Sequence, residues 1–246
     1  MKFFPKLICK GLNKRFIVLI LALFVVVLPL KAQGFGEIFR DLQWSARGTL
    51  LFLFEDNGNA SAPMPILPSL GVGASYSFNE LLAFEISLDI YGTTFDYDVN
   101  LQRVVAANDE FRSTFVLGSI LGFAPVYRFY PRGDAFTIRA YGGLSLDLRL
   151  IFRAYGIDDN EQHTNNNNAN TGLTVGQARQ EISSYFWGSG RFIYLFMGGG
   201  MDFPLLDNIQ LGFDLRLWIP VWRIWTGENL PLVDSFRLGI GFRLTF

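Results

Sequence analysis

The last twelve residues of this 246-residue chain alternate strictly between large apolar side chains and polar or small ones. One parity holds Phe236, Leu238, Ile240, Phe242, Leu244 and Phe246, and the other holds Ser235, Arg237, Gly239, Gly241, Arg243 and Thr245. Successive side chains of a β-strand point to opposite faces, so this pattern predicts a strand with one wholly apolar face. A lipid bilayer against the apolar face and a polar barrel interior against the other face would suit the side chains of both faces.

Seven earlier segments repeat the period-two pattern and predict further strands. They are residues 44–54, 69–78, 82–91, 114–130, 136–152, 191–203 and 209–221, followed by 235–246 as the eighth. Around Ile120 and around residues 193–197 both parities are apolar. The sequence therefore does not assign the faces of the fourth and sixth segments.

The connections between these segments alternate in length. Residues 79–81, 131–135 and 204–208 form three short connections, whereas the other four are longer. The short turns would meet at one end together with both chain termini, as in an up-and-down barrel with periplasmic turns and external loops. We therefore predict an all-β fold, an eight-stranded antiparallel transmembrane β-barrel over residues 44–246.

A soluble barrel of the lipocalin type is the competing fold, with the charged parity in water. Against it, the apolar parity is almost free of charge over whole strands, and the chain has no lysine after residue 31. Aromatic side chains also gather near the predicted strand ends, as in the interfacial girdles of membrane barrels. They are Phe78, Phe84, Tyr130, Phe136 and Phe203 at the turn end, and Phe54, Phe152, Tyr155, Tyr185 and Trp187 at the loop end.

Residues 1–32 have the pattern of a secretory signal peptide. A basic lead precedes the short apolar run 16–28, and Ala32 provides a small residue before a cleavage point at Gln33. A retained membrane anchor is the alternative. Residues 33–43 would follow as a periplasmic N-terminal lead. Because Cys9 precedes the apolar run, the exported chain would have no cysteine for a disulfide, a thiolate nucleophile or a metal site.

Cleavage would change the net charge from −1 to about −7, because six of the 21 basic residues and none of the 22 acidic ones precede residue 33. Such an acidic chain argues against nucleic acid as a partner. Every cation of the exported chain is an arginine. Either the composition has drifted, or arginines gather in a confined interior where guanidinium groups pair with carboxylates.

The charged parity of the predicted strands would face the barrel interior. It supplies Arg47, Arg139, Arg149, Arg153, Arg216, Arg237 and Arg243, with Glu85, Asp89, Asp147 and Asp214. Arg128 is a weaker candidate, on a strand whose faces are not assigned. Eight strands enclose little more than their own side chains, so we expect an interlocked, packed network of ion pairs. A narrow arginine-lined passage favouring anions is the functional alternative.

Two stretches resemble a known family. Residues 124–130, Ala-Pro-Val-Tyr-Arg-Phe-Tyr, and 138–143, Ile-Arg-Ala-Tyr-Gly-Gly, are similar to the fourth and fifth strands of OmpW-like proteins. The whole plan, with its terminal Phe246, resembles the broader set of OmpX and OmpA transmembrane families. The resemblance implies the outer membrane of a diderm bacterium, insertion by the barrel-assembly machinery through the C-terminal strand, and passive uptake of small, often hydrophobic solutes that can leave sideways into the membrane.

One local feature fits a sideways exit. Pro220 has no N–H to donate to a neighbouring strand, and proline in sheets is largely confined to edges, bulges and first positions. Trp218 and Trp222 share its inward parity. We hypothesise a lateral gate formed by Trp218, Pro220 and Trp222. In the alternative interpretation, strand pairing ends at Ile219 and Pro220 opens the loop.

Catalysis has little support in the sequence. The single histidine, His163, falls in the long segment 156–190, which we expect to be a solvated loop. No serine is placed beside it in a predictable geometry, as hydrolytic chemistry commonly requires. Asp158, Asp159 and Glu161 near it show no spacing of a known metal motif. We expect no enzyme activity, no cofactor and no metal.

The function expected first is passive uptake, or a channel for small solutes. The alternative is a non-conducting structural anchor or surface adhesion barrel that acts through its external loops. Those loops carry Glu55, Asp56, Asp96, Asp98, Asp109, Glu110, Asp158, Asp159, Glu161 and Glu181, which suit cations or basic host partners at the cell surface. Outer-membrane lipids are the remaining expected partners.

Overall fold

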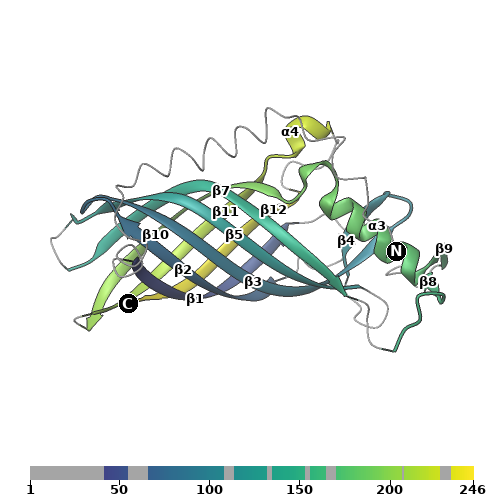
Figure 1. Ribbon diagram of the computed structural model, residues 1–246, viewed down its shortest axis with the longest axis horizontal. Coiled ribbons are helices and arrows are strands. Elements are labelled where there is room, and N and C mark those ends of the chain that lie inside the picture. The colour runs from purple at the N-terminus through teal and green to yellow at the C-terminus, as the bar shows by residue number, and fades with distance from the viewer. Residues whose placement is uncertain are drawn as a thin grey trace, which may run out of the picture. The chain divides into compact units, whose positions relative to one another are not determined.

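The computed structural model describes residues 42–54, 66–107, 114–131, 135–152, 156–164, 170–206, 208–227 and 234–246. Eight of its strands form a closed antiparallel barrel (Figure 1). They are β1 (Leu42–Phe54), β2 (Ile66–Ser77), β3 (Leu82–Asp98), β5 (Thr114–Phe129), β7 (Thr137–Phe152), β10 (Ile193–Leu206), β11 (Ile209–Pro220) and β12 (Phe236–Thr245). Each strand pairs with its neighbours in the chain, and β12 pairs with β1 to close the barrel. The predicted fold class is confirmed.

The strand bounds differ from the predicted ones mainly at the ends. β1 begins two residues before the expected Trp44, at Leu42, and β3 continues past Tyr91 to Asp98. The expected signal peptide and nearly all of the expected periplasmic lead lie outside the described residues. Among the described residues, no helix is both long and apolar enough to cross a membrane, a finding that does not bear on crossing by strands.

The outer face of the barrel is apolar on every one of its eight strands. Its exposed side chains include Leu50, Leu70, Ile90, Phe115, Leu150, Leu195, Leu215 and Phe242. The opposite parity, with Arg47 and Arg243, is buried inside. An apolar surface this extensive is not stable in water, and a polar interior inside an apolar wall is the plan of outer-membrane-type barrels. The soluble alternative is wrong, because the charged parity does not face solvent.

Short additional elements gather at the end of the barrel opposite the C-terminus (Figure 1). β4 (Arg103–Ala106) pairs with the outer end of β3. β8 (Gln162–Thr164) and β9 (Asn170–Thr174) form a hairpin that leads into α3 (Val175–Trp187) and the short helix Gly188–Gly190. α4 (Arg223–Thr226) follows β11. We call β4, β8, β9 and α3 the outer cap.

The helix α3 was not expected from the sequence, and the prediction of a solvated loop over 156–190 is wrong. Thr174 caps the helix by accepting a hydrogen bond from the Gln177 N–H, while the Gln177 side chain accepts one from the Thr174 N–H. Ala178, Ile182 and Phe186 follow at four-residue spacing and are buried. The helical repeat is hard to recognise in the sequence because its apolar stripe is narrow and polar residues surround it.

Candidate functional site: the barrel interior and its outer cavity

The charged side chains of the predicted network lie in the barrel interior. Arg47, Glu85, Asp89, Arg139, Asp147, Arg149, Asp214, Arg216, Arg237 and Arg243 all have side chains at most 12% exposed. Arg153 lies outside the described residues. Arg128 lies apart, near the short turns, where it donates to Ser77 Oγ and Gln43 Oε1 at 2.9 Å each. The structure groups the buried residues into two clusters.

The inner cluster lies toward the short turns. It contains Arg47, Arg139, Arg216, Arg243, Glu85, Asp89, Asp202, Asp214 and the hydroxyl of Tyr141. Arg47 Nη1 lies 2.8 Å from Glu85 Oε1, and Arg243 Nη1 lies 2.6 Å from Glu85 Oε2. Arg216 Nη1 lies 2.9 Å from Asp89 Oδ2. One chain of contacts therefore joins strands on opposite sides of the interior.

The second half of the inner cluster is built around Arg139. Its guanidinium donates to both carboxylate oxygens of Asp202 and, at 3.0 Å, to Asp214 Oδ1. Asp214 also accepts from the Tyr141 hydroxyl at 3.1 Å. Asp202 was missed by the sequence reasoning because it lies on the strand whose faces were not assigned. Asp202 shares a strand face with Gly198 and Gly200, which leave room for neighbouring side chains. This pattern in the sequence could have indicated that Asp202 faces the interior.

The inner cluster holds four arginines and four carboxylates, so its formal charges cancel. Paired ions in a low-dielectric interior are tolerated only when the geometry is good and further hydrogen bonds satisfy them. Each of these carboxylates lies within ion-pair distance of two arginines. The arrangement fills the inner half of the barrel with mutually constrained side chains.

The outer cluster lies toward the cap and contains Asp147, Arg149, Arg237, Tyr91 and Tyr194. Asp147 Oδ2 lies 2.5 Å from Arg149 Nε and 2.5 Å from Arg237 Nη2, and Asp147 Oδ1 accepts from the Tyr91 hydroxyl at 2.9 Å. Arg237 Nη2 also donates to the Tyr194 hydroxyl at 3.2 Å. Two arginines thus share one carboxylate, which leaves the outer cluster with one excess positive charge.

Aromatic side chains cover the outer cluster. Phe186 of α3 lies with its ring 3.9 Å below the guanidinium carbon of Arg149, and it packs edge-on against Phe95 at 4.9 Å between ring centres. Cations above aromatic faces are attracted by the ring quadrupole, more strongly when water is excluded. The helix α3 therefore inserts a side chain into the barrel mouth and holds Arg149 in place.

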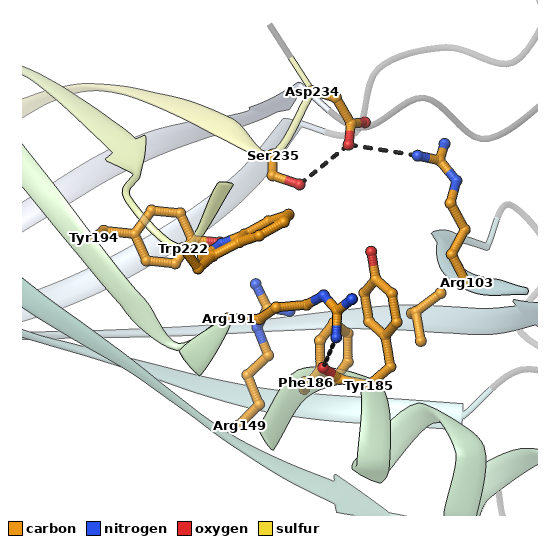
Figure 2. A pocket seen from close by; sticks show the side chains of 10 residues that line it. Arg103, Arg149, Tyr185, Phe186, Arg191, Tyr194, Trp222, Asp234 and Ser235 are labelled. Atoms are coloured by element: carbon orange, nitrogen blue, oxygen red, sulfur yellow. Dashed lines mark hydrogen bonds and ion pairs between the residues drawn. The ribbon is translucent and has the colours of Figure 1, made fainter. Parts of the chain in front are cut away.

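A small cavity remains beside the outer cluster (Figure 2). It is lined by Arg103, Val104, Arg149, Tyr185, Phe186, Arg191, Tyr194, Trp222, Asp234 and Ser235. The volume open to a water molecule is about 20 Å³, enough for a single ordered water. Arg103 Nη1 lies 3.4 Å from Asp234 Oδ2, and Arg191 lies over the Tyr185 ring at 4.0 Å. Arginine and aromatic groups dominate the lining.

The residues of the hypothesised lateral gate lie at the outer end of β11. β11 ends at Pro220, which is opposite Tyr194 of β10. Pairing with β12 ends earlier, at Trp218 opposite Arg237. Trp218 and Trp222 are both buried, at 3% and 2% exposure. Pairing with β10 thus ends one residue later than the Ile219 of the loop-opening interpretation, and the gate stays a prediction.

His163 is buried and bound within the outer cap. Its Nε2 lies 2.7 Å from Asp96 Oδ1 on β3, and its Nδ1 lies 2.9 Å from Thr171 Oγ1 on β9. The Thr171 hydroxyl donates to the His163 carbonyl, so its proton is held within the hairpin. Asp159 pairs instead with Arg179, at 3.0 Å. Among the described residues, no group of three or more histidine, cysteine or acidic side chains is placed to hold a metal.

Similarity to known proteins is found in structure and not in sequence. No protein-family model matches this chain, and no curated protein sequence matches it. Several solved structures are similar. OprG of Pseudomonas aeruginosa has 11% identity, with 83% of this chain and 94% of that chain covered, at a TM-score of 0.44. Neisserial surface protein A has 14% identity, 83% and 94% coverage and a TM-score of 0.43.

The N-terminal β-barrel domain of Pseudomonas aeruginosa OprF is a third similar structure. It has 11% identity, with 83% of this chain and 96% of that domain covered, at a TM-score of 0.40. All three are small barrels. Likeness at this level carries no information about activity or ligands.

Proposed function

We propose that this protein is a non-conducting barrel of the outer membrane of a diderm bacterium, which anchors a folded cap at the cell surface. The observation that carries the proposal is the filled interior, where the inner cluster spans the barrel from Arg47 to Arg139 with buried ion pairs. An ion crossing this layer would have to separate buried pairs, and breaking one such pair costs about 3–5 kcal/mol.

The outer cap supports a role at the surface. It adds a hairpin and a capped helix to the long connections, and Phe186 and Ile182 fix that helix on the barrel. Glu181 of α3 is exposed, as are Asp158 and Glu161 in the segment just before β8. A rigid acidic surface suits a basic host or surface ligand better than mobile chain does, because less ordering is lost on binding. Insertion would use outer-membrane lipids and the barrel-assembly machinery, with Phe246 at the end of the closing strand.

Electrical recording tests the proposal directly. The chain 33–246 is refolded, its barrel content is verified by circular dichroism, and it is inserted into planar lipid bilayers. We expect a folded protein without discrete current steps. As a matched control, Arg139→Ala with Asp202→Ala removes a pair from the inner cluster and should admit ions. Reproducible single-channel steps from the unmodified barrel would overturn the proposal and return the protein to the channel class.

Passive uptake of small hydrophobic solutes with sideways release is the second candidate. What favours it is the unequal end of β11: its pairing with β12 stops at Trp218, whereas its pairing with β10 continues to Pro220. A solute that leaves the barrel at the outer end of β11 would bypass the inner cluster. The absence of ion current in bilayers would therefore not exclude this route. Uptake of a fluorescent hydrophobic probe by cells carrying Pro220→Val tests the route. Equal uptake by the original protein and the variant would remove the case for a gate.

We infer that His163 does not act as a catalytic base. His163 faces Asp96 and Thr171 in a buried contact in which the hydroxyl proton is already donated to a carbonyl. A nucleophile held in this way has no access to a substrate carbonyl. Incubation of the refolded barrel with lipid and ester substrates should give no products above a His163→Gln control.

A further inference from the structure

The outer cavity combines excess charge with hydrogen-bond donors that have no acceptor. The outer cluster places Arg149 and Arg237 against the single carboxylate of Asp147, with side chains 6%, 2% and 1% exposed. A buried excess charge is costly unless a counter-charge compensates it. A negatively charged group near Arg149 would supply that compensation.

Arg149 directs its remaining donors toward the cavity that it lines. Only its Nε bonds to Asp147, and within the described structure its two terminal amino groups have no hydrogen-bond acceptor. Its guanidinium is held by stacking on Phe186 at 3.9 Å, which orients these donors without satisfying them. Held in this way, the charged donors of Arg149 are available to an acceptor in the cavity.

Two neutral donors line the same cavity. Trp222 Nε1 is buried and has no partner among the described residues. The Tyr194 hydroxyl accepts from Arg237 at 3.2 Å, and none of the described residues accepts its own proton. With Arg149, the three residues whose donors find no acceptor in the described part of the chain thus come from β7, β10 and the segment after β11.

We propose that this cavity is a binding site for a small inorganic anion of halide size. The anion would accept hydrogen bonds from Arg149, Tyr194 and Trp222 and neutralise the outer cluster. The space open to a water-sized particle is about 20 Å³, which suits a small inorganic anion better than phosphate or an organic anion. Asp234 also lines the cavity, and its carboxylate is bound by Arg103 at 3.4 Å and by the Ser235 hydroxyl at 3.2 Å (Figure 2).

Binding of an anion in this cavity does not depend on whether the barrel conducts. A bound halide would lock α3 to the barrel through Arg149 and Phe186, so the anion would stabilise the closed mouth. A neutral water molecule could satisfy the tryptophan and tyrosine donors, but it would leave the excess charge in place. Halide and water therefore predict different salt effects.

The test compares sodium bromide with sodium gluconate at equal ionic strength, using the full exported chain in detergent. Gluconate is too large for the cavity. We expect a higher thermal unfolding temperature in bromide, rising with concentration as mass action requires. Trp222→Phe keeps the ring and removes one donor, so it should weaken the bromide effect roughly tenfold in concentration. Arg179→Gln, on the exposed face of α3, is the matched control and should leave the bromide effect unchanged.

Crystals grown in bromide give the second readout. An anomalous peak between Arg149, Tyr194 and Trp222 is expected, and it should be absent from Trp222→Phe at low bromide. Equal unfolding temperatures in bromide and gluconate, with no anomalous peak or only a water molecule in the cavity, would overturn the proposal. A peak present equally in both proteins would overturn the assigned role of Trp222 and with it the site as described.

Discussion

Asp147 is the residue whose loss should destabilise the barrel most clearly. It is 1% exposed in its side chain and accepts from Arg149 and Arg237 at 2.5 Å each and from the Tyr91 hydroxyl at 2.9 Å. Asp147→Asn keeps the volume but removes the charge, which leaves two buried guanidinium groups without a counter-ion. Removing one partner of a buried pair costs about 3–5 kcal/mol of unfolding free energy.

The assay is urea unfolding of the refolded barrel in lipid vesicles, followed by tryptophan fluorescence and checked for reversibility. Asp159→Asn is the matched control, because Asp159 pairs with Arg179 at 3.0 Å while 43% of its side chain is exposed. Such a pair contributes about 0–1 kcal/mol. If the free energy of unfolding of the Asp147→Asn variant lies within about 1 kcal/mol of that of the Asp159→Asn control, buried charge does not dominate stability here and the reasoning is refuted.

A double variant separates charge from lost hydrogen bonds. Adding Arg149→Met to Asp147→Asn returns the outer cluster to the single excess positive charge that it has in the unmodified protein. We expect the double variant to be more stable than Asp147→Asn alone, with a coupling free energy of about 1–3 kcal/mol. Additive destabilisation would show that the two side chains do not interact.

Three further predictions concern the fold and its insertion. Gly143→Ala places a Cβ 2.0 Å from the Phe123 carbonyl oxygen and should cost about 1–3 kcal/mol in urea unfolding, whereas Gly48→Ala, with nothing within 4 Å, should change stability by less. His163→Ala removes the buried partner of Asp96 in the cap and should speed trypsin cleavage within α3 roughly tenfold or more. An unchanged cleavage rate would show that the contact between His163 and Asp96 does not hold the cap on the barrel. Phe246→Gly should lower the amount of assembled barrel in cells while leaving refolding in vitro unchanged, since its N–H bond to the Trp44 carbonyl is retained.

The strands were predictable because a membrane barrel imposes its pattern on every spanning residue. The apolar parity of β12 faces outward and Arg237 and Arg243 face inward, as alternation requires. The even strand count followed from alternating connection lengths. These features depend only on local geometry and on the solvent at each face, so the sequence carries them without knowledge of contacts.

Pairing inside the barrel and the structure of the cap depended on tertiary contacts. The sequence placed Arg139 and Asp214 on the inner parity, but only strand order and stagger bring them within 3.0 Å, and Asp202 joined them from a strand with two apolar parities. Likewise His163 carried no local sign of burial, since Asp96 lies 67 positions earlier in the chain. Alternation decides which face a side chain takes, whereas its partner depends on the register between strands and on loops that fold back over the mouth.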